Sequence, residues 1–180
     1  FLVLNPMDVH VPGSTYVSPS QPGTLPSPAD GLQSVYAYVD PGKQNFAYQL
    51  LGDPTINTKY TLEFAVGLGS SFASPNWDVY LLDSGMATIY AHMNSGDAGI
   101  NLPAAGTFVE NTISWTNTTV TTGGLQVFIS ATGKAGPDAW QEFFIDNVRL
   151  TAAAVPEPGT LSTVIVGLVG ALVYAWRKRK

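Results

Sequence analysis

The amino-acid sequence predicts an all-β protein, an antiparallel β-sandwich of the jelly-roll type, followed by a single C-terminal transmembrane helix. Short segments with two-residue alternation recur through residues 32–151 and are separated by Gly, Pro, Asn and Asp. Charged residues make up only 12% of the chain, and the helix formers Glu and Lys are scarce. An uncharged stretch at 159–176 then precedes four basic residues.

Residues 1–31 form a proline-rich N-terminal segment that we expect to be partly irregular. Six of the 13 prolines lie there, and each fixes φ and removes a backbone donor. The chain opens at Phe1 without an initiator Met or an apolar leader, as expected if a signal peptide has been removed or the sequence is a fragment.

Residues 32–151 form the predicted β-sandwich domain. Segment 59–68, for example, alternates Tyr60, Leu62 and Phe64 with Thr61 and Glu63, the pattern of a half-buried strand. No amphipathic helical period longer than two turns lies between the strands, so a parallel α/β sheet lacks its crossover helices. The strand candidates are 32–39, 46–51, 59–68, 77–82, 87–93, 107–115, 124–131 and 140–151.

Composition excludes several classes of function. Cysteine is absent, which rules out disulfides, thiolate metal sites and cysteine nucleophiles. Residues 1–158 hold 4 of the 8 Lys and Arg and all 13 Asp and Glu, and 4 − 13 gives a net charge of −9. Such an acidic segment repels phosphates, so we expect no nucleic acid as a partner.

Residues 159–176 are predicted to cross a membrane. A helix of this length spans roughly 27 Å, close to the apolar thickness of a bilayer. The basic cytoplasmic tail, Arg177, Lys178, Arg179 and Lys180, acts as a stop-transfer signal and places residues 1–158 outside. The alternative is a buried C-terminal helix of the domain, which four consecutive cations disfavour.

The linker 152–158 contains Val155, Pro156, Glu157 and Pro158, an extended segment that an outside enzyme could grip. With the apolar stretch and the basic end, it resembles the PEP-CTERM sorting family. The resemblance implies export in a Gram-negative bacterium, anchoring in the inner membrane, and cleavage near the Pro-Glu-Pro triplet by an exosortase. The chain is then expected at the cell surface or in the extracellular matrix.

The outer domain resembles carbohydrate-binding jelly rolls. The segments that carry the resemblance are Asp30-Gly31, Tyr48-Gln49-Leu50, Lys59-Tyr60-Thr61-Leu62 and Phe144-Ile145-Asp146-Asn147-Val148-Arg149-Leu150. It implies a structural calcium ion held by Asp146 with Asn5 or Asp8, since calcium takes six to eight hard oxygens. The alternative is that Asp146 and Asn147 hydrogen-bond a turn or a strand end.

Catalytic patterns are absent from the sequence. His10 and His92 belong to no triad or metal motif. Four carboxylates could supply a glycosidase-like pair, but solvated turn positions are the simpler interpretation. They are Asp78, Asp83, Asp97 and Glu110.

The outer domain is therefore predicted to be a binding or structural module for polysaccharide or matrix, with no enzymatic activity. Trp77, Trp115 and Trp140 are candidates for stacking on sugar rings, and the alternative is that they fill the core. The rival hypothesis is an extracellular jelly-roll enzyme, either carbohydrate-active or like the calcium-dependent cyclases.

Overall fold

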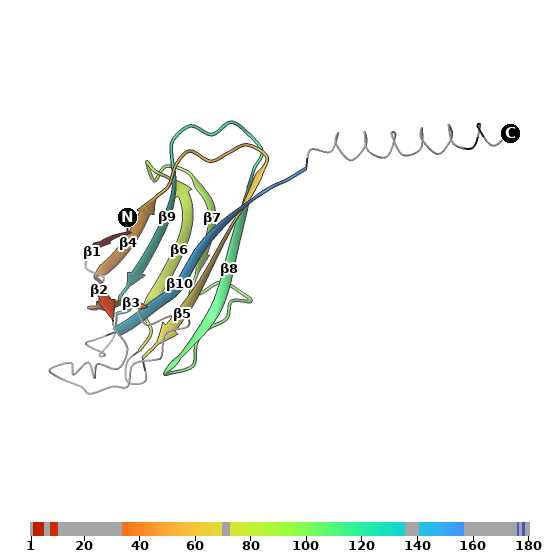
Figure 1. Cartoon of the computed structure of the whole chain (residues 1–180). Coiled ribbons are helices and arrows are strands. Elements are labelled where there is room, and N and C mark those ends of the chain that lie inside the picture. The colour runs from red at the N-terminus through yellow and green to blue at the C-terminus, as the bar shows by residue number, and fades with distance from the viewer. Residues whose placement is uncertain are drawn as a thin grey trace.

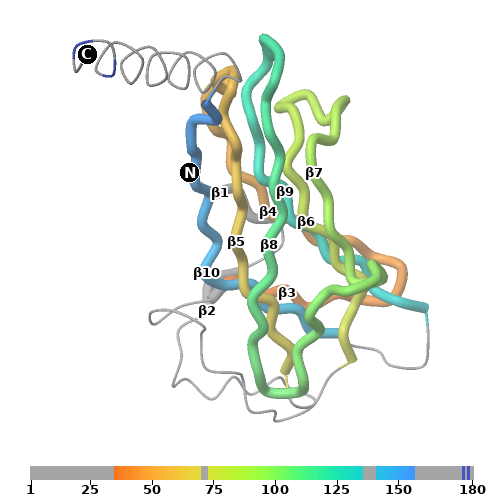
Figure 2. The backbone as a smooth tube through the Cα atoms, turned by 90° about the vertical axis from the view of Figure 1, so that its right-hand side faces the viewer, coloured from red at the N-terminus to blue at the C-terminus, as the bar shows by residue number. Residues whose placement is uncertain are grey.

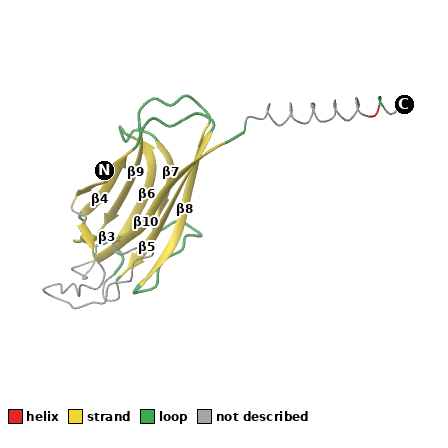
Figure 3. Cartoon of the chain, viewed as in Figure 1, coloured by secondary structure: helices red, strands yellow, loops and turns green. Residues whose placement is uncertain are grey.

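The structure is a computed structural model of the 180-residue chain. It describes residues 2–5, 8–10, 34–69, 73–135 and 141–156, together with Trp176 and Lys178. For residues 2–5, 8–10 and 34, it describes the backbone alone. Figure 3 draws the remaining residues in grey.

Ten strands form two five-stranded sheets that face each other (Figures 1 and 2). Sheet A has the order β1 (Leu2–Asn5), β4 (Gln44–Leu50), β9 (Leu125–Thr132), β6 (Asn76–Asp83) and β7 (Ile89–Asn94). Sheet B has the order β2 (Asp8–His10), β3 (Ser34–Val39), β10 (Gln141–Ala154), β5 (Thr58–Leu68) and β8 (Thr107–Asn117). All neighbouring strands in both sheets are antiparallel.

The predicted all-β jelly-roll sandwich is confirmed for the described residues. The eight strand candidates correspond to β3–β10, with ends that differ by a few residues. The strands β1 and β2 were not predicted, because segments of three or four residues are too short to show an alternation.

The core lies between the sheets, and β5, β6 and β9 each contribute alternate residues to it. Trp77 from sheet A has no exposed surface and packs against Phe143 and Phe64 of sheet B, with ring centroids 6.2 and 6.3 Å apart. In β10, Phe143 and Ile145 belong to this core, so Glu142 and Phe144 lie on the opposite, outer face of sheet B.

Strand β10 is central to sheet B and changes partners along its length. Residues 141–145 pair with β3, and residues 144–154 pair with β5. A bulge between Asp146 and Arg149 separates the two halves, and Asn147 adopts a left-handed φ of 52° there. Phe144 and Ile145 therefore pair with both neighbouring strands, which positions the site described below.

Within the described part of the chain, no helix combines the length and the apolar character needed to cross a bilayer. The predicted spanning segment, 159–176, lies outside the described residues except for Trp176. The same holds for Glu157, Pro158, Arg177, Arg179 and Lys180, so the membrane helix stays a prediction.

Candidate active site

Among the described residues, Glu142 has a carboxyl group that is buried on the outer face of sheet B. The residue is 1% exposed, and its side chain lies across from Tyr38 of β3. Its backbone N–H donates to the carbonyl of Ala73 at 3.1 Å, which ties the start of β10 to the segment before β6. The Oε1 atom is buried without a hydrogen-bond partner.

Burial changes the proton affinity of this carboxyl. Desolvation raises the pKa of Glu142 from 4.5 to about 7, and a hydrogen bond with the Tyr38 side chain opposes that rise. A carboxyl group with this pKa keeps its proton at mildly acidic pH and can release it near neutrality. This is the property that a general acid requires.

Aromatic rings surround Glu142 on the same face of the sheet. Tyr36 and Tyr38 lie edge to face with centroids 5.6 Å apart, and Tyr36 is 6.2 Å from Phe144. Phe108 of β8 meets Phe144 edge-on at 6.4 Å. We call Glu142 and these four rings the acid site.

Two glycines at the end of β5 leave room for the acid site. A Cβ on Gly69 would lie 1.6 Å from Glu142 Oε2, and a Cβ on Gly67 would lie 2.6 Å from the Phe108 ring. Real Cβ atoms essentially never approach other atoms this closely. The carboxyl and the Phe108 ring therefore occupy space that any other residue would fill.

This arrangement can protonate an apolar substrate and stabilise the cation that results. A neutral carboxyl donates a proton, and ring faces attract positive charge through their quadrupole. A low-dielectric site strengthens both effects, because little water is present to compete.

The predicted calcium ligands are only partly placed. The Asp146 carboxylate accepts the N–H of Asn147 at 2.7 Å. Such a local hydrogen bond was the alternative to a calcium-binding role for Asp146. Asn5 pairs with Phe46 in sheet A and Asp8 pairs with Tyr36 in sheet B, and neither side chain is described. No three His, Asp or Glu side chains of the described residues converge on one point, so calcium stays a prediction.

The three candidate tryptophans have different surroundings. Trp77 is a fully buried core residue, so its ring faces contact Phe143 and Phe64. Trp115 is half-buried between Tyr90 and Tyr60, with centroids 4.1 and 5.7 Å away. Trp140 lies outside the described residues.

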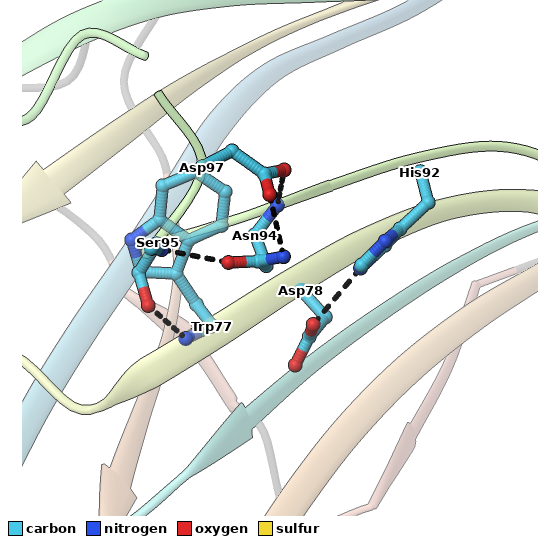
Figure 4. A network of polar contacts seen from close by, with 7 residues as sticks. Trp77, Asp78, His92, Asn94, Ser95 and Asp97 are labelled. Atoms are coloured by element: carbon cyan, nitrogen blue, oxygen red, sulfur yellow. Dashed lines mark hydrogen bonds and ion pairs between the residues drawn. The ribbon is translucent and has the colours of Figure 1, made fainter. Parts of the chain in front are cut away.

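The four carboxylates considered for a glycosidase-like pair each have a local partner. Asp78 Oδ1 lies 2.9 Å from His92 Nε2, and Asp97 accepts both the N–H and the side-chain amide of Asn94 at 2.8 Å (Figure 4). Asp83 accepts the N–H groups of Gly85 and Thr88 in the turn after β6. Glu110 accepts the side-chain amide of Asn147 at 2.7 Å, so Asp83, Asp97 and Glu110 all serve local structure.

Glu142 was not among the predicted site residues. In sequence it follows Gln141 and precedes Phe143, so it has the place of an ordinary outward-facing strand residue. Its burial depends on Tyr38 and Gly69, which are distant in sequence, and the only local signal is a charged residue beside a run of apolar ones.

Comparison with known families confirms the interpretation of the C-terminus. Residues 154–180 match the PEP-CTERM protein-sorting motif. The motif implies an exported, sorted protein that an exosortase processes. Residues 9–151 match the family model of the HpiC1 cyclase. No curated protein sequence matches the chain.

Solved structures share the fold at low identity. One is the Stig cyclase FisC from Fischerella sp. TAU in complex with (3Z)-3-(1-methyl-2-pyrrolidinylidene)-3H-indole, with a TM-score of 0.63, 20% identity, and 83% of this chain and 76% of that chain covered. Another is a cyclase from Fischerella sp. TAU in complex with 4-(1H-indol-3-yl)butan-2-one, with a TM-score of 0.60, 18% identity, and coverage of 87% and 90%. A CBM4 structure has a TM-score of 0.51 and 15% identity, with coverage of 84% and 94%.

The prediction of a domain without enzymatic activity is wrong. It rested on the absence of histidine triads and of a convincing carboxylate pair, whereas a single buried acid leaves no such pattern in a sequence. The matching family model is that of a cyclase, and it spans most of the sequence, residues 9–151 of 180. The chain therefore belongs to the HpiC1-like family of cyclases.

Proposed function

We propose that this chain is an exported cyclase that uses Glu142 as its general acid. The observation that carries the proposal is one buried carboxyl, 1% exposed, with an unpartnered oxygen and a pKa raised to about 7 among aromatic rings. Its substrate is an apolar, electron-rich unsaturated molecule. The indole compounds bound in the two cyclase structures of the same fold belong to this chemical class.

The reaction needs no external reagent. Glu142 gives its proton to a carbon of the substrate, and the resulting cation is attacked by a π bond of the same molecule. A carbon–carbon bond forms, a proton is lost from the cyclic cation, and the Glu142 carboxylate recovers it. Product and substrate are isomers, so atoms and electrons balance.

The surrounding rings and Tyr38 have separate roles in this scheme. Tyr36, Phe108 and Phe144 offer ring faces to the cationic intermediate, an interaction worth about 2 kcal/mol when water is excluded. The Tyr38 hydrogen bond to Glu142 favours the carboxylate and so limits the rise of the pKa. It keeps the acid strong enough to act near neutral pH.

A proton-exchange assay tests the role of Glu142. The purified full chain is incubated in D₂O with 4-(1H-indol-3-yl)butan-2-one as a probe, and deuterium uptake at ring carbon is followed by NMR. We expect exchange that decreases as the pH rises above about 7 and that falls by about 100-fold or more in Glu142→Gln.

The matched control is Glu63→Gln. Glu63 is a half-buried carboxylate of β5 whose Oε2 lies 3.6 Å from Arg149. Its loss should leave exchange unchanged. Equal exchange by Glu142→Gln and the wild type would overturn the proposal.

The sorting tail determines where this activity would act. We propose that residues 159–176 hold the exported domain at the inner membrane until an exosortase cleaves near Pro156. Support comes from the family match of residues 154–180 and from the exposure of Val155 and Pro156, the described part of the motif.

We also propose that the exported chain binds polysaccharide at the surface or in the matrix. The observation that favours this second function is a row of aromatic rings on the outer face of sheet A, across the sandwich from the acid site. Tyr48 of β4, Phe128 of β9 and Tyr80 of β6 form it as cross-strand neighbours. It is independent of catalysis by Glu142.

A further inference from the structure

Four side chains form one cross-strand row on the outer face of sheet A. Tyr48 of β4 pairs with Phe128 of β9, Phe128 pairs with Tyr80 of β6, and Tyr80 pairs with His92 of β7. Tyr80 stacks on His92 with centroids 4.2 Å apart and lies 6.0 Å from Phe128. We call these four residues the ring row.

The ring row is long and partly open to solvent. Three steps between neighbouring strands, at about 4.8 Å each, give it a length of about 14 Å. His92 is exposed, and Tyr48, Tyr80 and Phe128 are half-buried. Figures 1 and 2 show β4, β9, β6 and β7 as adjacent strands of this sheet. A linear ligand with flat apolar faces could lie along the row, perpendicular to the strands.

Polar groups flank the ring row on both sides. Gln126, one alternate position before Phe128 on β9, is 1% exposed, and its Nε2 donor is buried without a partner. On the other side, Asp78 pairs with Ser130, which is 1% exposed, and Asp78 Oδ1 lies 2.9 Å from His92 Nε2 (Figure 4). A buried amide donor without a hydrogen-bond partner destabilises a folded protein, so an acceptor from a ligand would stabilise it.

The charge of the domain selects among possible ligands. Residues 1–158 carry a net charge of −9, and Asp78 stands beside the row itself. An acidic polymer would be repelled, whereas a neutral sugar offers C–H faces for the rings and hydroxyl groups for Gln126 and Asp78.

We infer that the ring row is the binding site for a neutral polysaccharide, with Gln126 and Asp78 as its polar contacts. This inference rests on the proposed binding of polysaccharide and gives it a location. The site is separate from the acid site, because it lies on the outer face of the other sheet.

The test uses the purified full chain and three probes: cellulose oligomers and xylan oligomers as neutral ligands, and polygalacturonic acid as an acidic one. We expect calorimetry to detect a neutral probe and not the acidic one. Tyr80→Ala should weaken that binding by about tenfold or more, because a stacking ring is lost.

Gln126→Leu is the sharper variant, because it retains side-chain bulk and removes the amide whose Nε2 donor has no partner. The fold should be as stable as the wild type or more so, since a buried unsatisfied donor disappears. Binding should fall by about tenfold. This variant therefore separates a binding role from a structural one.

Glu63→Gln on sheet B is the matched control, and it should bind sugar as the wild type does. If neither neutral probe binds, both the proposed polysaccharide binding and its assignment to the ring row are overturned. Binding that is unchanged in Tyr80→Ala and Gln126→Leu would overturn the site alone. Loss of deuterium exchange in Glu142→Gln bears only on the proposed cyclase.

Discussion

Glu142 links the candidate chemistry to the stability of the fold. A carboxyl group whose folded-state pKa lies above its unfolded value is favoured in its protonated form by folding. The pKa of Glu142 is raised from 4.5 to about 7 by desolvation. The same burial that makes it a proton donor near neutral pH therefore makes the folded state sensitive to pH.

The predicted effect is a loss of stability as the pH rises. The contribution of Glu142 to the free energy of unfolding is fully present below pH 4.5, and it is lost as the pH rises through about 7. The difference amounts to about 3 kcal/mol in the free energy of unfolding. Urea denaturation at pH 4.5 and pH 8.5, followed by tryptophan fluorescence, measures it.

Glu142→Gln provides the comparison, since an amide has no charge at either pH. We expect the free energy of unfolding of the variant to decrease much less between pH 4.5 and pH 8.5 than that of the wild type. A decrease of the same size in the variant would show that other groups cause it.

At the scale of single residues, little of the site could be predicted from the sequence. Glu142 looks like a solvated strand position because its partners, Tyr38 and Gly69, are far away in the chain. The ring row is equally hidden, since Tyr48, Tyr80 and His92 belong to three different strands. Such sites depend on strand order, which residue alternation does not specify.

At the scale of strands, the close approach of β5 and β10 shapes the acid site. Gly69 follows the last residue of β5, and the Glu142 carboxyl lies where its Cβ would be. Glycine is needed here for space, since its φ is not in the left-handed region. Gly69 is thus a positioning residue for the proposed acid.

Gly69→Ala is expected to displace the Glu142 carboxyl and to lower deuterium exchange by about tenfold or more. The double variant Gly69→Ala with Glu142→Asp should regain part of the lost exchange, because aspartate is one methylene shorter. The pH profile of exchange should shift in Gly69→Ala, which a purely structural loss would not cause. Failure of the double variant to recover any exchange would contradict this role.

The strands themselves were predictable because each buries one face. In β6 and β9, apolar residues alternate with polar or aromatic ones. This alternation can be seen in the sequence whichever strands are neighbours in the sheet. The bulge at Asn147 was not predicted, since a left-handed asparagine inside a strand has no clear sequence signal. The resemblance to carbohydrate-binding jelly rolls pointed to the fold, whereas a cyclase-like enzyme was only the rival hypothesis.

At the scale of the whole molecule, the chain joins a folded domain directly to a sorting signal. The sorting motif match begins at residue 154, which is the last residue of β10. Val155 still donates its N–H to the carbonyl of Asn57 at 2.7 Å. Almost no linker therefore separates the domain from the sorting signal.

Two changes in the tail test the sorting proposal. Replacing Glu157 by Ala, or deleting residues 177–180, should leave the full-length chain unprocessed in an exosortase-containing host. The reason is that the first change alters the motif to be cleaved and the second removes the stop-transfer signal. Mass spectrometry of the cell-surface and membrane fractions distinguishes processed from intact protein.

A conservative Arg179→Lys variant keeps the charge and serves as the control. It should be processed like the wild type. Normal processing of both altered chains would refute the assignment of these residues to sorting.

The path of β10 also has a mechanical consequence. The strand runs from the acid site to the tail, and nine of its residues pair with β5 between Phe144 and Ala154. Cross-strand hydrogen bonds stand perpendicular to the strand direction. Tension on the C-terminus along β10 would load these bonds together in shear, so the domain resists a pull on its C-terminal end without separating strand by strand.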